Sequence, residues 1–154
     1  MSQEVNQQLN LPHAELRIEQ RYGHLCVWDH LRRRWIVLTP EEYIRQQFTH
    51  WMTDSLGYPS ARLALEVSLE LNGMKRRCDA VFYDRQSQPQ IIIEFKAPHI
   101  HISQQTFNQI CRYNMAMHVP LLIVSNGISH YCARIEKEKV EFLREIPPYK
   151  ELQN

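Results

Sequence analysis

The sequence lacks the features that place a chain in a membrane or in an oxidising compartment. It has no run of about 18 consecutive apolar residues and no signal-peptide pattern at its N terminus. Its four cysteines have no CxxC spacing, which argues against a zinc knuckle and against a disulfide framework. We therefore expect a cytoplasmic protein without membrane contact, whose thiols are reduced and buried: Cys26, Cys78, Cys111 and Cys132.

The sequence also lacks a strong net charge, a nucleotide-binding loop and internal repeats. Its 18 Lys and Arg residues nearly cancel its 17 Asp and Glu residues, so no global field draws the chain onto nucleic acid or a membrane. Neither GxxxxGKS nor GxxxxGKT occurs, and 154 residues leave no room for helicase domains. We expect a flexible N terminus at residues 1–10, one domain at residues 11–148 and a tail at residues 149–154.

Two strand-like segments carry acidic side chains at positions that bring them together. Residues 91–98 read IIIEFKAP, and Asp79 lies in the earlier segment RRCDAVFYD. The polar stretch between them predicts a hairpin loop centred between Gln86 and Ser87. That register predicts three opposed pairs: Tyr83 with Gln90, Val81 with Ile92, and Asp79 with Glu94.

A divalent cation would relieve the repulsion within the acidic pair. Residues directly opposed on two strands have Cβ atoms about 5 Å apart, and two carboxylates at that spacing repel unless a cation lies between them. Mg²⁺ commonly uses one or two carboxylates together with a substrate phosphate. Glu94 and Lys96 share one strand face, so Lys96 would stand beside the metal and hold a phosphate or activate water. An ordinary surface salt bridge among these residues is the alternative.

A helix that begins after Thr39 offers a third acid. Threonine at the N-cap, proline at the first helical position and glutamate three residues after the cap form a start signal, and Glu42 is explained by a capping box. Glu41 instead projects onto the apolar stripe, and we expect it to point toward Asp79 and Glu94. Favourable charge near a helix N terminus is the alternative role of Glu41. The stripe consists of Ile44, Phe48, Trp51 and Met52.

A second helix, starting near Ser103, carries a polar line at successive i+4 steps. Gln105, Gln109 and Tyr113 share one face, where amide and phenol groups could position a phosphate or orient the Lys96 ammonium. A solvated helix face explains the same line.

Basic residues gather in two places, residues 32–34 and residues 75–77. The second cluster, formed by Lys75, Arg76 and Arg77, directly precedes Asp79 on the same strand, where a phosphate backbone would enter. A solvated strand edge is the alternative, since arginine runs are often simply exposed to water.

The remaining patterns predict a mixed sheet with helices on its faces. Residues 14–20 and 24–28 form an expected hairpin around Tyr22-Gly23, which residues 34–38 extend. Residues 62–71 alternate strongly, so their apolar side chains are expected on one face, and residues 120–125 suit a buried strand. Strands are also expected at residues 128–135 and 140–143. A helix, three strands, a helix and a strand in this order indicate an α/β fold.

Together these residues resemble a known family pattern. The chain resembles the PD-(D/E)XK nucleases that carry a QxxxY motif. More narrowly, it resembles the N-terminal nuclease region of type I restriction enzyme R subunits. Residues 38–42, 72–73 and 94–98 carry this likeness, which covers roughly residues 11–148. One departure is Cys78, which stands where a proline often precedes the aspartate. The residues that match the motif are, in order, Glu41, Asp79, Glu94, Phe95, Lys96, Gln109 and Tyr113.

The resemblance implies a restriction-endonuclease-like αβββαβ core and a metal-dependent endonuclease that hydrolyses DNA phosphodiester bonds. Catalysis would rest on Asp79, Glu94, Lys96 and Glu41. The resemblance implies Mg²⁺, with Mn²⁺ as a substitute, held by both carboxylates of the pair, the Phe95 carbonyl and Glu41. The residues expected to position DNA are Gln109, Tyr113, Lys75, Arg76 and Arg77.

The partners implied are DNA, other restriction–modification subunits and, as one option, a second copy of the chain. The helicase motor of an R subunit is absent from these 154 residues. A different class of function also fits the sequence: a non-catalytic module that binds nucleic acid or assists assembly in a defence system while keeping the fold.

Overall fold

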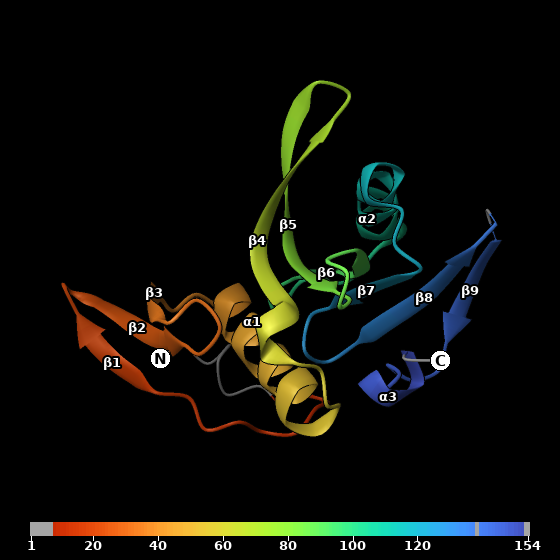
Figure 1. Ribbon diagram of the computed structural model, residues 1–154. Coiled ribbons are helices and arrows are strands. Elements are labelled where there is room, and N and C mark those ends of the chain that lie inside the picture. The colour runs from red at the N-terminus through yellow and green to blue at the C-terminus, as the bar shows by residue number, and fades with distance from the viewer. Residues whose placement is uncertain (1–7, 138, 153–154) are drawn as a thin grey trace.

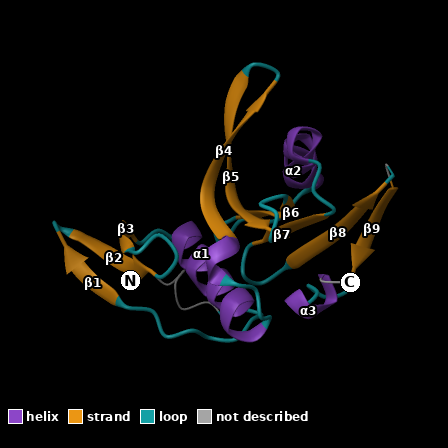
Figure 2. Cartoon of the chain, in the orientation of Figure 1, coloured by secondary structure: helices purple, strands orange, loops and turns teal. Residues whose placement is uncertain are grey.

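The computed structural model describes residues 8–137 and 139–152, so the predicted flexibility of residues 1–7 lies outside the described part. Two β-sheets are joined by helix α1 (Pro40–His50), as Figures 1 and 2 show. The smaller, N-terminal sheet has the order β1-β2-β3, and its strands are β1 (Ile18–Arg21), β2 (His24–Asp29) and β3 (Arg34–Val37).

The N-terminal hairpin turns where the sequence predicted it. Tyr22 and Gly23 have φ values of 51° and 78°, so both central residues of the two-residue turn are left-handed. Such a turn matches the right-handed twist of the flanking strands, which is why it is favoured between antiparallel strands. β3 continues the sheet on the other side of β2, and Trp28 lies opposite Trp35.

The larger sheet is mixed, as expected, and has the order β4-β5-β6-β7-β8-β9. Of its described pairs, β6 and β7 alone are parallel, and α2 (Gln104–Met117) makes the crossover between them. This connection agrees with the rule that parallel neighbours need a long crossover, commonly a helix. The strands are β4 (Leu63–Leu71), β5 (Met74–Tyr83), β6 (Pro89–Phe95), β7 (Leu121–Ser125), β8 (His130–Glu136) and β9 (Lys139–Leu143).

The two long helices pack on opposite faces of this sheet and divide the core in two. The α1-side cluster includes Phe48, whose ring centroid lies 5.4 Å from that of Phe95. The α2-side cluster includes Ile110, which is fully buried. Because β6 and β7 contribute to both clusters, their apolar side chains are buried on both faces. Each large apolar side chain buried in this way stabilises the fold by about 1.5–3 kcal/mol.

Both helices start at a side-chain cap, of which the sequence predicted the one at Thr39. The Thr39 hydroxyl accepts a hydrogen bond from the backbone N–H of Glu42, and the Ser103 hydroxyl accepts one from Thr106. α2 ends at His118, whose φ of 54° places it in the left-handed conformation that closes many helices. No helix in the described ranges is long and apolar enough to cross a membrane.

A short helix, α3 (Tyr149–Leu152), closes the described chain against the α1-side cluster. The Tyr149 ring lies 5.7 Å from the Tyr58 ring and 5.6 Å from the Phe82 ring, between centroids. Its backbone N–H donates to the Leu56 carbonyl. Residues 149–152, which the sequence analysis set apart as a tail, thus pack on the core, while the domain boundaries themselves stay a prediction.

The β4–β5 ribbon turns over halfway along its length. Leu63 and Leu65 of β4 pack in the α1-side cluster, whereas Val67 and Leu69 pack in the α2-side cluster. β5 behaves in the same way: Ala80 belongs to the first cluster and Cys78 to the second. The prediction that residues 62–71 place their apolar side chains on one face is therefore wrong.

The reversal occurs at Glu66, whose φ of 54° lies in the left-handed region. The pairs on either side of it, Leu65 with Ala80 and Val67 with Cys78, place Glu66 opposite Asp79. A non-glycine residue in this conformation costs about 1–2 kcal/mol. Beyond the turn-over the ribbon continues as an arm that projects from the sheet, as Figure 1 shows.

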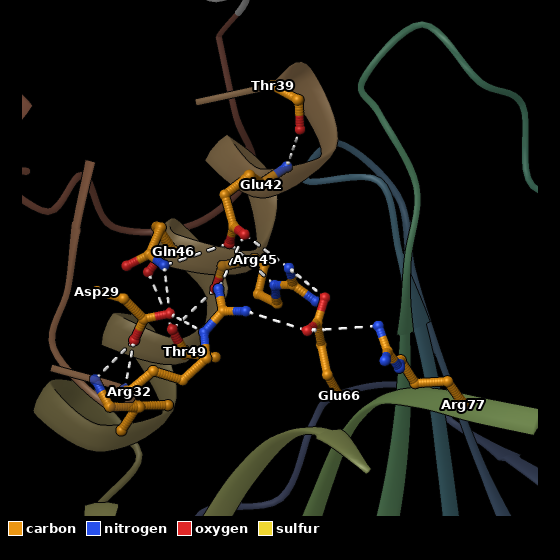
Figure 3. Close-up of polar contacts among 10 residues, drawn as sticks. Asp29, Arg32, Thr39, Glu42, Arg45, Gln46, Thr49, Glu66 and Arg77 are labelled. Carbon is orange, nitrogen blue, oxygen red and sulfur yellow. Dashed lines mark hydrogen bonds and ion pairs between the residues drawn. The ribbon is translucent and has the colours of Figure 1, made fainter. Parts of the chain in front are cut away.

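Three arginines hold the Glu66 carboxylate at the turn-over (Figure 3). Arg32 Nη1 lies 3.5 Å from Oε2, Arg45 Nη2 lies 3.5 Å from Oε1, and Arg77 Nη1 lies 3.6 Å from Oε2. Arg32 and Arg45 expose only 13% and 10% of their side chains, so water screens these charges little. These attractions offset the backbone strain at Glu66.

We expect glycine and alanine substitutions to destabilise the fold in one order at Glu66 and in the opposite order at an ordinary strand position. Glu66→Gly should be less destabilising than Glu66→Ala, because both variants lose the three ion pairs but glycine adopts a positive φ without strain whereas alanine retains the strain. At Glu70, an exposed position in the regular part of β4, glycine should be the more destabilising of the two. Urea unfolding midpoints of the four variants measure this. The same order at both positions would contradict a strained Glu66.

Candidate active site

The pairing of β5 with β6 follows the predicted register over most of its length. Val81 lies opposite Ile92, as predicted, and Ala80 lies opposite Ile93. At the loop end a register shift after Phe82 places Tyr83 opposite Pro89, so the predicted pair of Tyr83 with Gln90 is wrong. At the other end, the regular pairs stop at Ala80 and Ile93, one residue short of the predicted pair of Asp79 with Glu94.

Asp79 and Glu94 come together where the regular ladder stops. Asp79 Oδ2 accepts a hydrogen bond of 2.8 Å from the backbone N–H of Phe95, which fixes its carboxyl group beside β6. Glu94 is 6% exposed, and its Oε2 atom is buried without a hydrogen-bond partner in the described part of the chain. Lys96 Nζ lies 3.9 Å from Glu94 Oε1. A buried, half-satisfied carboxyl group is costly for a fold to retain.

The electrostatics of the pair reflect this crowding. Burial, followed by the charge of Asp79, raises the pKa of Glu94 to about 8. Burial also raises the pKa of Asp79, although the Phe95 N–H and the charges of Arg45 and Lys96 oppose the rise. At neutral pH the two carboxyl groups therefore share a proton unless another cation takes its place.

Glu41 belongs to the same electrostatic group, although it does not lie on the buried apolar stripe where the helical pattern placed it. Its pKa is raised, first by partial burial and then by the charge of Asp79, while Lys96 lowers it. Its side chain is nevertheless exposed, so it faces the site from the solvent side rather than from the core.

The carboxylate of Glu42 has a different role from the one predicted. The helix cap itself is present, but the carboxylate does not complete a capping box. Instead it accepts hydrogen bonds from Arg45, at 2.6 and 2.9 Å, and from Arg32, at 2.9 Å. Glu42 is 4% exposed, and the two guanidinium groups lower its pKa against the effect of burial. Arginines from α1 and from the β2–β3 loop attract the carboxylate more strongly than the helix N terminus does.

Arg45 is a site residue that the sequence analysis missed. Its charge lowers the pKa of Asp79, and it also binds Glu42 and Glu66, so it links the acidic pair to the ion pairs of Figure 3. A signal existed in the sequence, because Arg45 follows Glu41 by four residues and so shares its helix face.

The predicted basic cluster is divided between the two faces of the arm. Arg77 pairs with Glu66, and Lys75 lies opposite Glu70 on β4, whereas Arg76 lines a pocket of about 630 Å³ between the arm and α2. Gln109 of α2 lines the same pocket. Tyr113 lies within α2, but its side chain falls outside the described part, so its predicted role cannot be placed here.

The donor set of the acidic pair suits a hard divalent cation. Two carboxylates, one with a buried oxygen that lacks a partner, offer the oxygen ligands that Mg²⁺ prefers. Within residues 8–137 and 139–152, no three His, Cys, Asp or Glu side chains converge closely enough to hold an ion on their own. An ion would therefore keep water or substrate oxygens in its other positions, with Glu41 reaching it through water.

Comparisons with known proteins bear on the family and the fold of the chain. The family model described as Type I restriction enzyme R protein N terminus matches residues 40–147. No curated protein sequence matches the chain. Among solved structures, a fragment described as the HsdR subunit of a type I restriction enzyme from Vibrio vulnificus YJ016 has a similar fold, with a TM-score of 0.53 and 16% identity. The match covers 75% of this chain and 25% of that one.

The acidic pair predicts a pH dependence of stability in the absence of metal. Because the pKa of Glu94 is higher in the folded than in the unfolded state, the folded protein binds the extra proton, and its stability should fall as pH rises toward about 8. The loss should be at most about 1.4 kcal/mol per pH unit from this group. Asp79→Asn removes the repelling charge and should flatten the profile between pH 5.5 and 8.5.

Urea unfolding in EDTA measures both profiles. Glu70→Gln, which removes an exposed acid on β4, serves as the control and should parallel the wild type. Parallel profiles for the wild type and Asp79→Asn would show that the two carboxyl groups do not interact.

Proposed function

The chain belongs to the family of type I restriction enzyme R protein N termini, and on this premise we propose that it is a metal-dependent nuclease domain that hydrolyses DNA phosphodiester bonds. The observation that carries the proposal is the buried acidic pair with an ammonium group beside it, since Glu94 retains an unpartnered oxygen and Lys96 lies 3.9 Å from its carboxylate. A fold under no functional demand would gain stability by replacing such a pair.

The proposed cofactor is Mg²⁺, with Mn²⁺ as a substitute. Asp79 and Glu94 would hold the ion, the Phe95 carbonyl would add a third oxygen, and Glu41 would act from the solvent side through water. When bound, the ion supplies charge that polarises the phosphoryl group and lowers the pKa of water. The Phe95 N–H, which donates a hydrogen bond to Asp79 Oδ2, supports this role because it holds the carboxyl group beside β6.

Lys96 would act on the reacting phosphate. It is part exposed, at 26% of its side chain, so its ammonium can contact a substrate while remaining attached to Glu94. Charge that builds on the phosphate oxygens in the transition state would be stabilised by this ammonium. Gln109, which lines the pocket between the arm and α2, would help to position the DNA from α2, and Tyr113 is proposed for the same role. Lys75, Arg76 and Arg77 would contact the DNA backbone.

The proposed partners are DNA and further subunits of a restriction system. The chain spans a quarter of the length of the structural relative, so a translocating motor would have to come from another part of such a system. A homodimer is the remaining proposed assembly.

Removing the Lys96 ammonium should separate binding from cleavage. Lys96→Ala should reduce Mg²⁺-dependent plasmid cleavage on the order of a hundredfold or more, because a group that stabilises transition-state charge is lost. DNA affinity should fall far less. Lys96→Arg should also fail to cut, since a planar guanidinium cannot replace a compact ammonium. Gel-based cleavage rates and fluorescence anisotropy measure the two effects, and Lys150→Ala is the exposed control.

If Lys96→Ala cleaves at the wild-type rate, the catalytic mechanism is wrong. DNA binding without any wild-type cleavage would favour a non-catalytic nucleic-acid-binding module.

The neighbouring glutamates of α1 should respond in opposite ways. Glu41→Gln should weaken Mg²⁺ binding and cleavage by about tenfold at unchanged thermal stability, because Glu41 is exposed and faces Asp79. Glu42→Gln should instead lower stability by about 3 kcal/mol, since two buried guanidinium groups lose their shared anion. Calorimetric Mg²⁺ titration and thermal melts distinguish these outcomes. Loss of stability in Glu41→Gln would contradict this division of roles.

A further inference from the structure

A groove separates the projecting arm from helix α2. Its pocket has a volume of about 630 Å³. The arm consists of the part of the β4–β5 ribbon beyond Glu66, and Figure 1 shows it standing beside α2. The arm supplies Asn72, Met74 and Arg76, and α2 supplies Gln105, Asn108 and Arg112. We call this the arm–α2 groove.

The turn-over at Glu66 creates this groove. Residues of β5 with even numbers face the α1-side cluster at Ala80 and Phe82, but Cys78 faces the α2-side cluster. Arg76 and Met74 continue the alternation from Cys78, so they also point toward α2. Without the reversal, these side chains would lie on the opposite side of the ribbon.

The chemistry of the groove is that of a site for a polyanion with hydrogen-bonding bases. Its lining carries two guanidinium groups and several carboxamides, and none of the described lining residues is an acid. Arginine binds phosphate or guanine through two donors, and Asn and Gln bind adenine edges through a donor and an acceptor. The six lining side chains named above are exposed, apart from their contacts within the groove.

The groove also lies at a definite distance from the acidic pair, because both include β5. Arg76 precedes Asp79 by three residues, which corresponds to about 10 Å along β5. Asn72, in the turn at the tip of the arm, precedes Asp79 by seven residues, which corresponds to at most about 23 Å. DNA advances about 3.4 Å per nucleotide. The groove therefore begins roughly three nucleotides from the acidic pair and ends roughly seven nucleotides away.

We propose that the arm–α2 groove binds duplex DNA about three to seven nucleotides to one side of the cut, and that it gives the enzyme a preference for flanking bases. This inference rests on the proposed nuclease function and adds a recognition site to it. Arg76 and Arg112 hold the strand, and the carboxamides contact base edges. A two-stranded β-ribbon such as the arm fits the major groove of duplex DNA, which favours a duplex over a single strand.

Binding of DNA duplexes of different lengths tests this proposal. Fluorescence anisotropy with the full chain is measured in Ca²⁺ in place of Mg²⁺, using one duplex that extends ten base pairs on both sides of a mapped cut and one that extends two. Arg76→Ala and Arg112→Ala should bind the long duplex about fivefold to tenfold more weakly, with a salt slope reduced by about one. With the short duplex both variants should match the wild type.

Arg85→Ala is the matched control, because it removes an equal charge from the exposed loop between β5 and β6. It should change affinity less than twofold for either duplex. In Mg²⁺, Gln105→Ala and Asn108→Ala should alter which flanking bases are selected for cleavage from a randomised duplex library.

The outcomes separate this inference from the proposed function. If the wild type cleaves DNA and the groove variants behave like Arg85→Ala, the proposed DNA-binding role of the groove is wrong and the proposed nuclease function stands. Absence of both DNA binding and cleavage in the wild type would overturn the two together. Equal losses on the long and the short duplex would place the arginines at the cut itself, and tighter binding of duplex RNA would overturn the assignment to DNA.

Discussion

The ion pairs of Glu66 are the constraint on which the arrangement of this molecule depends. Three guanidinium groups surround one carboxylate and hold its backbone in a left-handed conformation that a non-glycine residue rarely adopts. At that point the β4–β5 ribbon turns over, and Asp79 lies directly opposite. Below the turn-over the ribbon covers α1, and above it the ribbon faces α2. The candidate active site therefore lies at the junction of two differently oriented halves of one hairpin.

The acidic pair of the candidate site lowers the stability of the fold. The core packs on both faces of β6, yet the same strand ends in a buried glutamate with an unpartnered oxygen. Burial and the charge of Asp79 make ionisation of Glu94 unfavourable, while Arg45 and Lys96 moderate the repulsion without removing it. Uncompensated repulsion of this kind is expected at a site where a ligand brings the opposite charge.

Local patterns predicted much of this structure, and long-range contacts explain what they missed. The helix cap at Thr39, the Tyr22-Gly23 turn and most of the β5–β6 register depend on near neighbours, and all three are present as predicted. The contact of Glu42 with Arg32 could not be predicted, because Arg32 reaches it from another element. The alternation of β4 failed at one backbone torsion, that of Glu66, which no pattern of apolar residues encodes.

The contribution of Arg32 has a consequence for where the functional unit ends. The family resemblance begins at residue 40, yet Arg32 of the N-terminal sheet supplies one of the three cations that hold Glu66 and binds Glu42 as well. A protein trimmed to the matched segment would keep every acid of the candidate site and lose part of the support that orients them. In the evolution of this chain, the N-terminal sheet would then be under selection together with the site, although it lies outside the region where sequence similarity is recognised.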